Sequence, residues 1–128
     1  MDKISYFCIE NEQYSGTYNI SRGWGNGYLV IPRGHILWGK DYEDINSDDD
    51  IYVHGGWTFS RYYREIDKIK NKIITDLDGI ELKIKDDDWI IGFDTSHYND
   101  DLNVWPKKRV FEHISEIAEH YSRVENLI

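Results

Sequence analysis

The chain has 128 residues, of which 40% are apolar, 15% aromatic and 30% charged, the profile of a single compact domain. This length is enough to bury a core without a disulfide or a structural metal. With 24 acidic and 15 basic residues the formal charge is −9, which argues against general binding to DNA, RNA or anionic lipid. Cys8 is the only cysteine, which excludes an intrachain disulfide, a zinc ribbon or an iron–sulfur cluster.

No part of the sequence approaches the roughly 18 to 20 consecutive apolar residues of a membrane span. Residues 1–6 have neither the basic region nor the apolar core of a secretory signal. We therefore expect a cytoplasmic protein without a membrane partner.

The first part of the chain predicts short strands separated by turns. Residues 4–9 are apolar and aromatic, which predicts a strand. Residues 10–27 are polar and rich in glycine and tyrosine, which indicates turns, and they match no nucleotide-binding glycine motif. Residues 28–32 predict a second strand, residues 39–45 one or two helical turns, and residues 46–50 an acidic surface loop.

The middle of the chain is more ambiguous. Residues 51–54 predict another short strand, whereas residues 61–72 fit a helical pattern only loosely. An Asp-Gly dipeptide between residues 73–76 and residues 80–85 favours a tight hairpin. Residues 86–88 are three aspartates and predict a solvated turn.

Two later elements have the clearest patterns. Residues 89–93 are nearly continuously apolar, which predicts a central strand buried on both faces. Residues 106–123 predict a helix, because apolar residues recur at intervals of three and four: Val110, Phe111, Ile114, Ile117, Ala118, Tyr121 and Val124. Short strands followed by one long helix predict an α+β fold, with the C-terminal helix packed on a small, mostly antiparallel sheet.

Three clusters place glycines beside polar side chains at the ends of predicted strands. Strand ends hold many pockets of such folds, because the sheet fixes the geometry and the loops supply functional groups. The clusters are Pro32-Arg33-Gly34-His35 with Trp38-Gly39, then Val53-His54-Gly55-Gly56-Trp57, and finally Gly92-Phe93-Asp94-Thr95-Ser96-His97. We expect the three clusters to converge on one pocket.

Asp94 and His97 carry the strongest catalytic signal. Three positions apart, they can meet across a turn, where the carboxylate would orient the imidazole for proton transfer or metal ligation. Together with His54 they are the candidate catalytic residues of a hydrolase. His35 and His54 would complete a mononuclear metal site, but no metal-binding spacing is present, so we assign no metal and no cofactor. The alternative is structural: a capped turn at Asp94, and a chain reversal at Gly55 and Gly56.

Aromatic and arginine side chains favour a nucleotide pocket. Aromatic faces can stack on a base, arginines can pair with phosphate, and imidazole and carboxylate groups can hydrogen-bond ribose or phosphate. The stacking residues would be Trp38, Tyr42 and Trp57, and the phosphate-binding residues Arg33 and Arg61. The groups that hydrogen-bond ribose or phosphate would be His35, His54, Asp94 and His97. The alternative is that the aromatic residues belong to the core or to a subunit interface.

Two further features are interpreted as structural. His113, Glu116 and His120 have a spacing that could bind a metal, but they lie opposite much of the apolar stripe and predict a solvated helix face. Cys8 lies between Phe7 and Ile9, so we expect a buried and unreactive thiol.

Four motifs resemble a recurrent family of small proteins found in phages and mobile elements of bacteria. They are Tyr28-x-x-x-Pro32-x-Gly34-His35, Trp38-Gly39-Lys40-x-Tyr42, Val53-His54-Gly55-Gly56-x-Thr58-Phe59-Ser60 and Trp89-Ile90-Ile91-Gly92-Phe93-Asp94-x-x-His97. The resemblance implies a host bacterial cytoplasm and a site at the three clusters. A small acidic protein in that context is similar to phage anti-defence proteins that sequester signalling nucleotides.

The leading functional hypothesis is therefore a homo-oligomeric anti-defence protein that sequesters a cyclic nucleotide or an ADP-ribose derivative. A second hypothesis is a hydrolase or nuclease of such nucleotides that uses Asp94 and His97. A third is an acidic protein that blocks a nucleic-acid-binding effector, with residues 41–50 and 86–88 as phosphate mimics.

Overall fold

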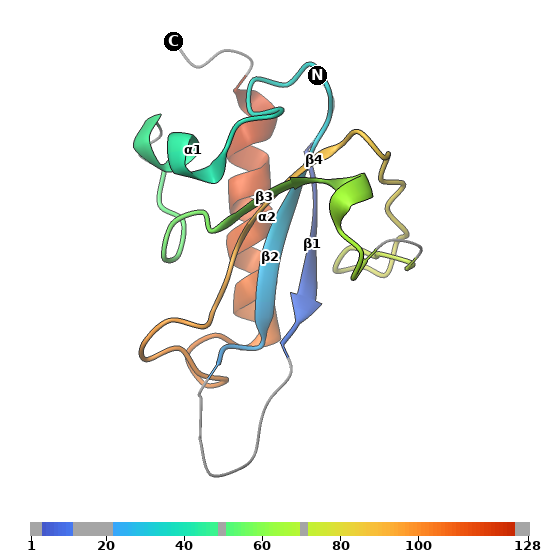
Figure 1. Cartoon of the computed structure of the whole chain (residues 1–128). Helices are drawn as coiled ribbons and strands as arrows, with labels where there is room; N and C mark the ends of the chain where they lie inside the picture. The colour runs from blue at the N-terminus through green and yellow to red at the C-terminus, as the bar shows by residue number, and fades with distance from the viewer. Residues whose placement is uncertain (1–3, 12–21, 49–50, 70–71, 125–128) are drawn as a thin grey trace.

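A four-stranded antiparallel sheet and one long helix form the framework of the protein (Figure 1). The computed structural model describes residues 4–11, 22–48, 51–69 and 72–124. The strand order is β1-β2-β4-β3, where the strands are β1 (Ser5–Glu10), β2 (Gly25–Ile31), β3 (Phe59–Tyr62) and β4 (Trp89–Phe93). This arrangement confirms the α+β class predicted from the sequence.

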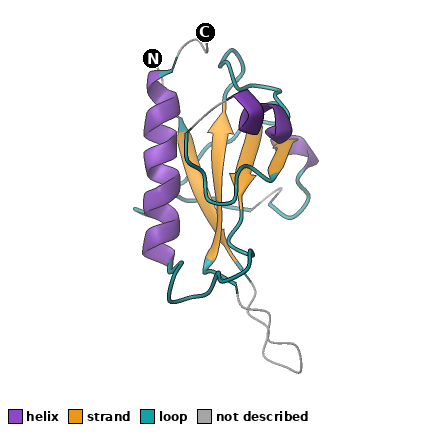
Figure 2. Ribbon diagram, turned by 90° about the vertical axis from the view of Figure 1, so that its left-hand side faces the viewer, coloured by secondary structure: helices purple, strands orange, loops and turns teal. Residues whose placement is uncertain are grey.

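Helix α2 (Lys107–Arg123) packs against β1 and β2 and lies along one side of the sheet (Figure 2). It buries the predicted apolar stripe from Val110 to Tyr121, and Pro106 stands at its N-cap in an extended conformation. The predicted helix is confirmed. In the part of the chain that the structure describes, no helix has the length and apolar character needed to cross a membrane.

Strand β4 is buried on both faces, as its continuous apolar sequence predicts. Consecutive side chains of a strand point to opposite faces. Ile91 therefore joins the core beneath α2, whereas Ile90 packs with Phe7 and Ile69 on the other side. Partly buried apolar side chains from residues 66–84 cover that second face.

The strand register separates the two ends of the sheet. Gly27 pairs with Phe93 at one end, and Ile31 pairs with Trp89 at the other. A strand advances about 3.3 Å per residue, so the two ends of β4 lie about 13 Å apart. Loops that leave opposite ends of β4 therefore cannot share one small pocket.

Two predictions for the middle of the chain are wrong. Residues 51–54 form no strand, because Ile51 and Val53 pack into the core as single side chains while the backbone turns at His54 and Gly55. Residues 61–69 and 72 form no α-helix, and residues 70–71 of the predicted segment lie outside the described residues. The segment begins with the end of β3 and continues into a 3₁₀ helix, η1 (Tyr63–Glu65).

Helix α1 (Tyr42–Asp48) runs into the predicted acidic loop, of which residues 49–50 lie outside the described residues. At the N-terminal side, β2 begins at Gly25, within the segment predicted as turns, of which residues 12–21 are not described. The predicted hairpin is reduced to one antiparallel bridge between Thr75 and Glu81.

The predicted acidic turn at residues 86–88 is only partly solvated. Asp88 is 6% exposed, and its Oδ2 accepts a hydrogen bond of 2.8 Å from the backbone N–H of Lys85. Burial raises the pKa of this carboxyl group. One of the three carboxylates therefore serves the fold, which weakens the hypothesis of a phosphate-mimicking surface.

Candidate functional site

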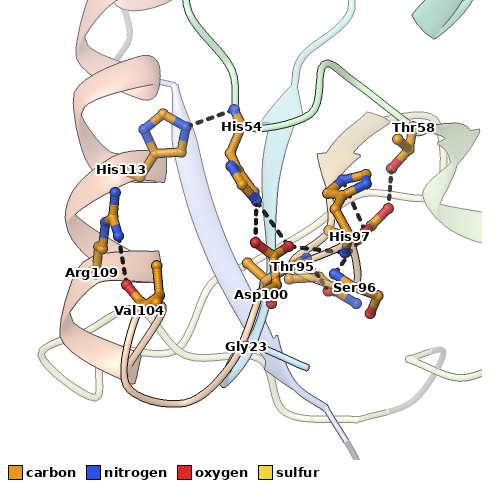
Figure 3. A network of polar contacts seen from close by, with 12 residues as sticks. Gly23, His54, Thr58, Thr95, Ser96, His97, Asp100, Val104, Arg109 and His113 are labelled. Carbon is orange, nitrogen blue, oxygen red and sulfur yellow. Dashed lines mark hydrogen bonds and ion pairs between the residues drawn. The ribbon is translucent and has the colours of Figure 1, made fainter. Parts of the chain in front are cut away.

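Polar side chains from three distant segments meet beside the C-terminal end of β4 (Figure 3). The turn at His54, the loop of residues 94–100 and the first half of α2 each contribute to this group. We call His54, Asp94, His97 and Asp100 the His–Asp cluster. The structure thus brings together the second and third clusters predicted from the sequence.

The most buried contact of the His–Asp cluster joins His54 to Asp100. Nε2 of His54 lies 3.0 Å from Oδ1 and 2.9 Å from Oδ2 of Asp100, and the two side chains are 16% and 4% exposed. Oδ2 of Asp100 also accepts a hydrogen bond of 2.9 Å from the backbone N–H of His97. Since the carboxylate has partners from both loops, it ties the loops together.

His97 and Asp94 form a second, more exposed imidazole–carboxylate pair. Nε2 of His97 lies 3.2 Å from Oδ1 of Asp94, with side chains 36% and 31% exposed. This contact is not aligned as a hydrogen bond, and Nε2 has no hydrogen-bond partner among the described residues. Asp94 itself is held by Thr58, whose hydroxyl donates to Oδ2 at 2.9 Å, and by the backbone N–H of Ser96, which donates to Oδ1 at 3.0 Å.

Gly55 allows the two loops to approach this closely. Its φ of +69° lies in the left-handed region, and a Cβ atom at this position would stand 2.2 Å from Nε2 of His97. Any side chain here would displace the His97 ring and strain the backbone. The glycine of this motif is therefore required by the packing of His97.

The loop that carries Asp94 and His97 is anchored to the sheet through Thr95. This residue is fully buried, its hydroxyl donates to the carbonyl oxygen of Gly25 at 2.7 Å, and its own carbonyl oxygen accepts from the N–H of Gly23 at 2.8 Å. Asp94 and His97 thus stand on a rigid support.

His113 supports the cluster from α2. Its Nε2 accepts a hydrogen bond of 3.1 Å from the backbone N–H of His54, and its ring lies against the rings of Phe93 and Trp105. Burial, followed by the nearby His54 and Arg109, lowers the pKa of His113 to about 4. The ring is therefore neutral at pH 7, with its proton on Nδ1. The prediction of a solvated helix face is wrong for His113, because residues 54 and 105 cover it.

A cavity of about 350 Å³ adjoins the cluster at Gly55. Its lining includes Val53, Gly56 and Trp57. Trp57 is 2% exposed, and its indole Nε1 has no hydrogen-bond partner among the described residues. A buried donor without a partner costs free energy in the folded chain.

The first predicted cluster lies elsewhere, so the three clusters do not form one pocket. His35 is engaged at both ring nitrogens, because Nδ1 accepts from the N–H of Leu37 at 3.1 Å and Nε2 lies 3.0 Å from the carbonyl oxygen of Tyr121. Tyr121 is eight residues beyond His113 on α2, about 12 Å along the helix axis. His35 thus caps the end of α2 away from the His–Asp cluster.

The predicted base-stacking residues are also dispersed. Trp38 packs on Tyr62, and its indole N–H donates to the carbonyl oxygen of Asp87 at 2.8 Å, at the opposite end of β4. The remaining predicted ligand-binding residues occupy separate positions: exposed Arg33 above the Trp38 ring, exposed Gly34 in the same turn, Tyr42 at the start of α1 and exposed Arg61 on β3. The core explains the aromatic residues better than a base sandwich does.

Three residues of the site were missed in the sequence analysis: Thr58, Asp100 and His113. Asp100 had a signal, because it follows His97 by three positions as His97 follows Asp94. His113 flanks the buried Ile114, at the edge of the apolar stripe. Cys8 is half-buried rather than fully buried as predicted, and this burial raises the pKa of its thiol.

Comparisons with protein-family models, with curated proteins and with solved structures find no match to this chain. The function of the protein is therefore inferred from the geometry of the His–Asp cluster and from the cavity beside it.

Proposed function

We propose that this protein is a hydrolase that cleaves a phosphate ester or anhydride bond of a small nucleotide at the His–Asp cluster. The observation that carries this proposal is the convergence of two imidazole–carboxylate pairs, His54–Asp100 and His97–Asp94, beside Gly55, which also lines a cavity. Pairs of this kind hold, accept and donate protons in hydrolytic reactions.

Asp94 is the best candidate for the general base. Thr58 and the backbone of Ser96 fix its carboxylate, yet its side chain is 31% exposed and can reach a water molecule. The water oxygen would bond to phosphorus as the bond to the leaving oxygen breaks. Asp94 would accept the proton of the water, and the leaving oxygen would take a proton from solvent.

The cavity and the sequence resemblance support a nucleotide as the substrate. A volume of about 350 Å³ falls within the range of small-molecule pockets, and Trp57 contributes an aromatic side chain to the lining. The resemblance to phage and mobile-element proteins points to nucleotides that bacterial defence enzymes make as signals.

Sequestration without cleavage is the second candidate function. The same cavity favours it, because a cavity can bind a nucleotide without any reaction. In this form the protein would act as a homo-oligomeric anti-defence protein in a host bacterial cytoplasm.

One experiment separates the two candidates. Purified protein is incubated with cyclic dinucleotides and ADP-ribose derivatives, filtered and heated, and both fractions are analysed by mass spectrometry. A cleaved product that Asp94→Asn abolishes supports the hydrolase, provided that Asp86→Asn, the same change of charge at an exposed turn, leaves cleavage intact. An intact nucleotide released only on heating supports sequestration, whereas a panel that stays free in the filtrate contradicts both.

A further inference from the structure

We propose that His54, His97 and Asp100 form a binding site for one divalent transition-metal ion of the zinc class. Each residue offers one ligand atom, and the three atoms lie within 4.8 Å of one another. Two imidazole nitrogens and one carboxylate oxygen are typical ligands of Zn²⁺. The site depends on these three residues alone and needs no assumption about the substrate.

The backbones that carry the two histidine ligands are already held in place. The backbone N–H of His54 is held by Nε2 of His113, and the backbone N–H of His97 is held by Asp100. Fixed ligands lose little conformational freedom when an ion binds, and supporting hydrogen bonds of this kind raise metal affinity.

One ring nitrogen of the proposed site is incompletely paired. Nε2 of His97 is shielded from solvent and has no hydrogen-bond partner among the described residues, although Asp94 is close. At His54, Nε2 already faces both carboxylate oxygens of Asp100, so one ion can contact the two side chains together.

An ion can reach the proposed site from solvent. Asp100 is nearly buried, but the side chain of His97 is 36% exposed, so solvent reaches one side of the group. Three protein ligands leave a coordination position for water or substrate, which is the pattern of catalytic rather than structural zinc sites.

An ion here would also resolve an electrostatic conflict. A phosphate that entered the cluster would meet the carboxylates of Asp94 and Asp100 on a chain of net charge −9. A divalent cation balances those two charges and attracts phosphate oxygens, while Asp94 remains free to act on a bound water. This use of the ion, unlike the binding site itself, rests on the proposed function.

The test is a titration of chelator-treated protein with Co²⁺ and Zn²⁺, followed by visible absorption and calorimetry. We expect one ion per chain, a tetrahedral cobalt spectrum, and an affinity at least tenfold lower in His97→Ala and in Asp100→Asn. His120→Ala is the matched control, because it removes an exposed imidazole of α2 outside the cluster and should leave the affinity unchanged. His97→Ala changes the more exposed ligand, so it keeps the test valid if Asp100→Asn fails to fold.

Absence of binding, or equal binding by wild type and both ligand variants, would overturn the metal site. Its failure is distinguishable from failure of the hydrolase. Tight cobalt binding without any nucleotide cleavage would leave the site standing and refute the reaction, whereas nucleotide cleavage by a protein that binds no cobalt would refute the site alone.

Discussion

Nε2 of His54 lies within 3.0 Å of both carboxylate oxygens of Asp100, 46 positions further along the chain. This contact closes the turn after residue 53 onto the loop after β4. It connects the fold to the proposed chemistry, because the same two side chains fix the loops and supply two of the three proposed metal ligands.

Asp100→Asn should lower the free energy of unfolding of the metal-free protein by about 2 kcal/mol, the scale of a hydrogen bond to a charged group. Asparagine keeps the shape but removes the charge that His54 and the N–H of His97 contact. Urea unfolding in the presence of a chelator measures the change. Asp86→Asn should shift stability by less than about 0.5 kcal/mol, and a variant Asp100→Asn as stable as wild type would contradict the structural role of the pair.

Gly55→Ala should disturb the site more than an alanine at another left-handed glycine. The added Cβ would stand 2.2 Å from Nε2 of His97, whereas at Gly79, with φ of +81°, it would meet nothing within 4 Å. Both variants should lose about 1 kcal/mol or more from backbone strain. Gly55→Ala should lose additional stability and weaken cobalt binding, and Gly79→Ala should bind cobalt as wild type does. Equal effects of the two variants would show that His97 does not pack on Gly55.

Lowering the pH should destabilise the metal-free protein, because His113 binds a proton more readily in the unfolded chain than in the folded one. The pKa of His113 is lowered to about 4 by burial and by the neighbouring His54 and Arg109, against an ordinary value of 6.5. Between these two values the unfolded state binds more protons than the folded state, so the free energy of unfolding decreases as pH drops from 6.5 toward 4 and is unaffected by this group above that range.

Urea unfolding at several pH values checks this expectation. His113→Gln cannot titrate and should show a shallower decrease than wild type over the same window, whereas His120→Ala, which changes an exposed histidine of the same helix, should keep the full decrease. Identical pH profiles for wild type and His113→Gln would mean that His113 titrates normally.

Thr58→Val should separate catalysis from metal binding. The hydroxyl of Thr58 donates to Oδ2 of Asp94, which lies outside the three proposed ligands. Valine has nearly the same shape but cannot orient the carboxylate, so nucleotide cleavage should fall about tenfold, as for other residues that position a functional group. Cobalt affinity should not change. Thr75→Val, at an exposed threonine, is the control. Unchanged nucleotide cleavage in Thr58→Val would show that the orientation of Asp94 does not matter to the reaction.

Local patterns predicted the elements that carry their own signal. β4 is a continuous apolar run and α2 a regular stripe, so their burial could be read from residues 89–93 and 110–121. β3 escaped prediction, because only its pairing with β4 makes the mixed sequence Phe59–Tyr62 a strand. Residues 51–54 were wrongly predicted as a strand, because their apolar side chains pack into the core although their backbone pairs with no strand.

The candidate site was half predictable. The Asp94–His97 contact follows from a spacing of three, whereas the partnership of His54 with Asp100 and His113 depends on contacts across 46 and 59 positions. The expected contribution of His35 failed because the sheet register places its loop at the other end of β4. No local pattern contains that information.

The central claim is that His54, His97 and Asp100 hold a divalent ion at the proposed reaction centre. Crystals grown with Zn²⁺ and measured on both sides of the zinc absorption edge test it directly. The account predicts an anomalous peak between the two imidazoles and the carboxylate, within bonding distance of all three. A peak located elsewhere, or none at a zinc concentration that saturates the protein in solution, would contradict it.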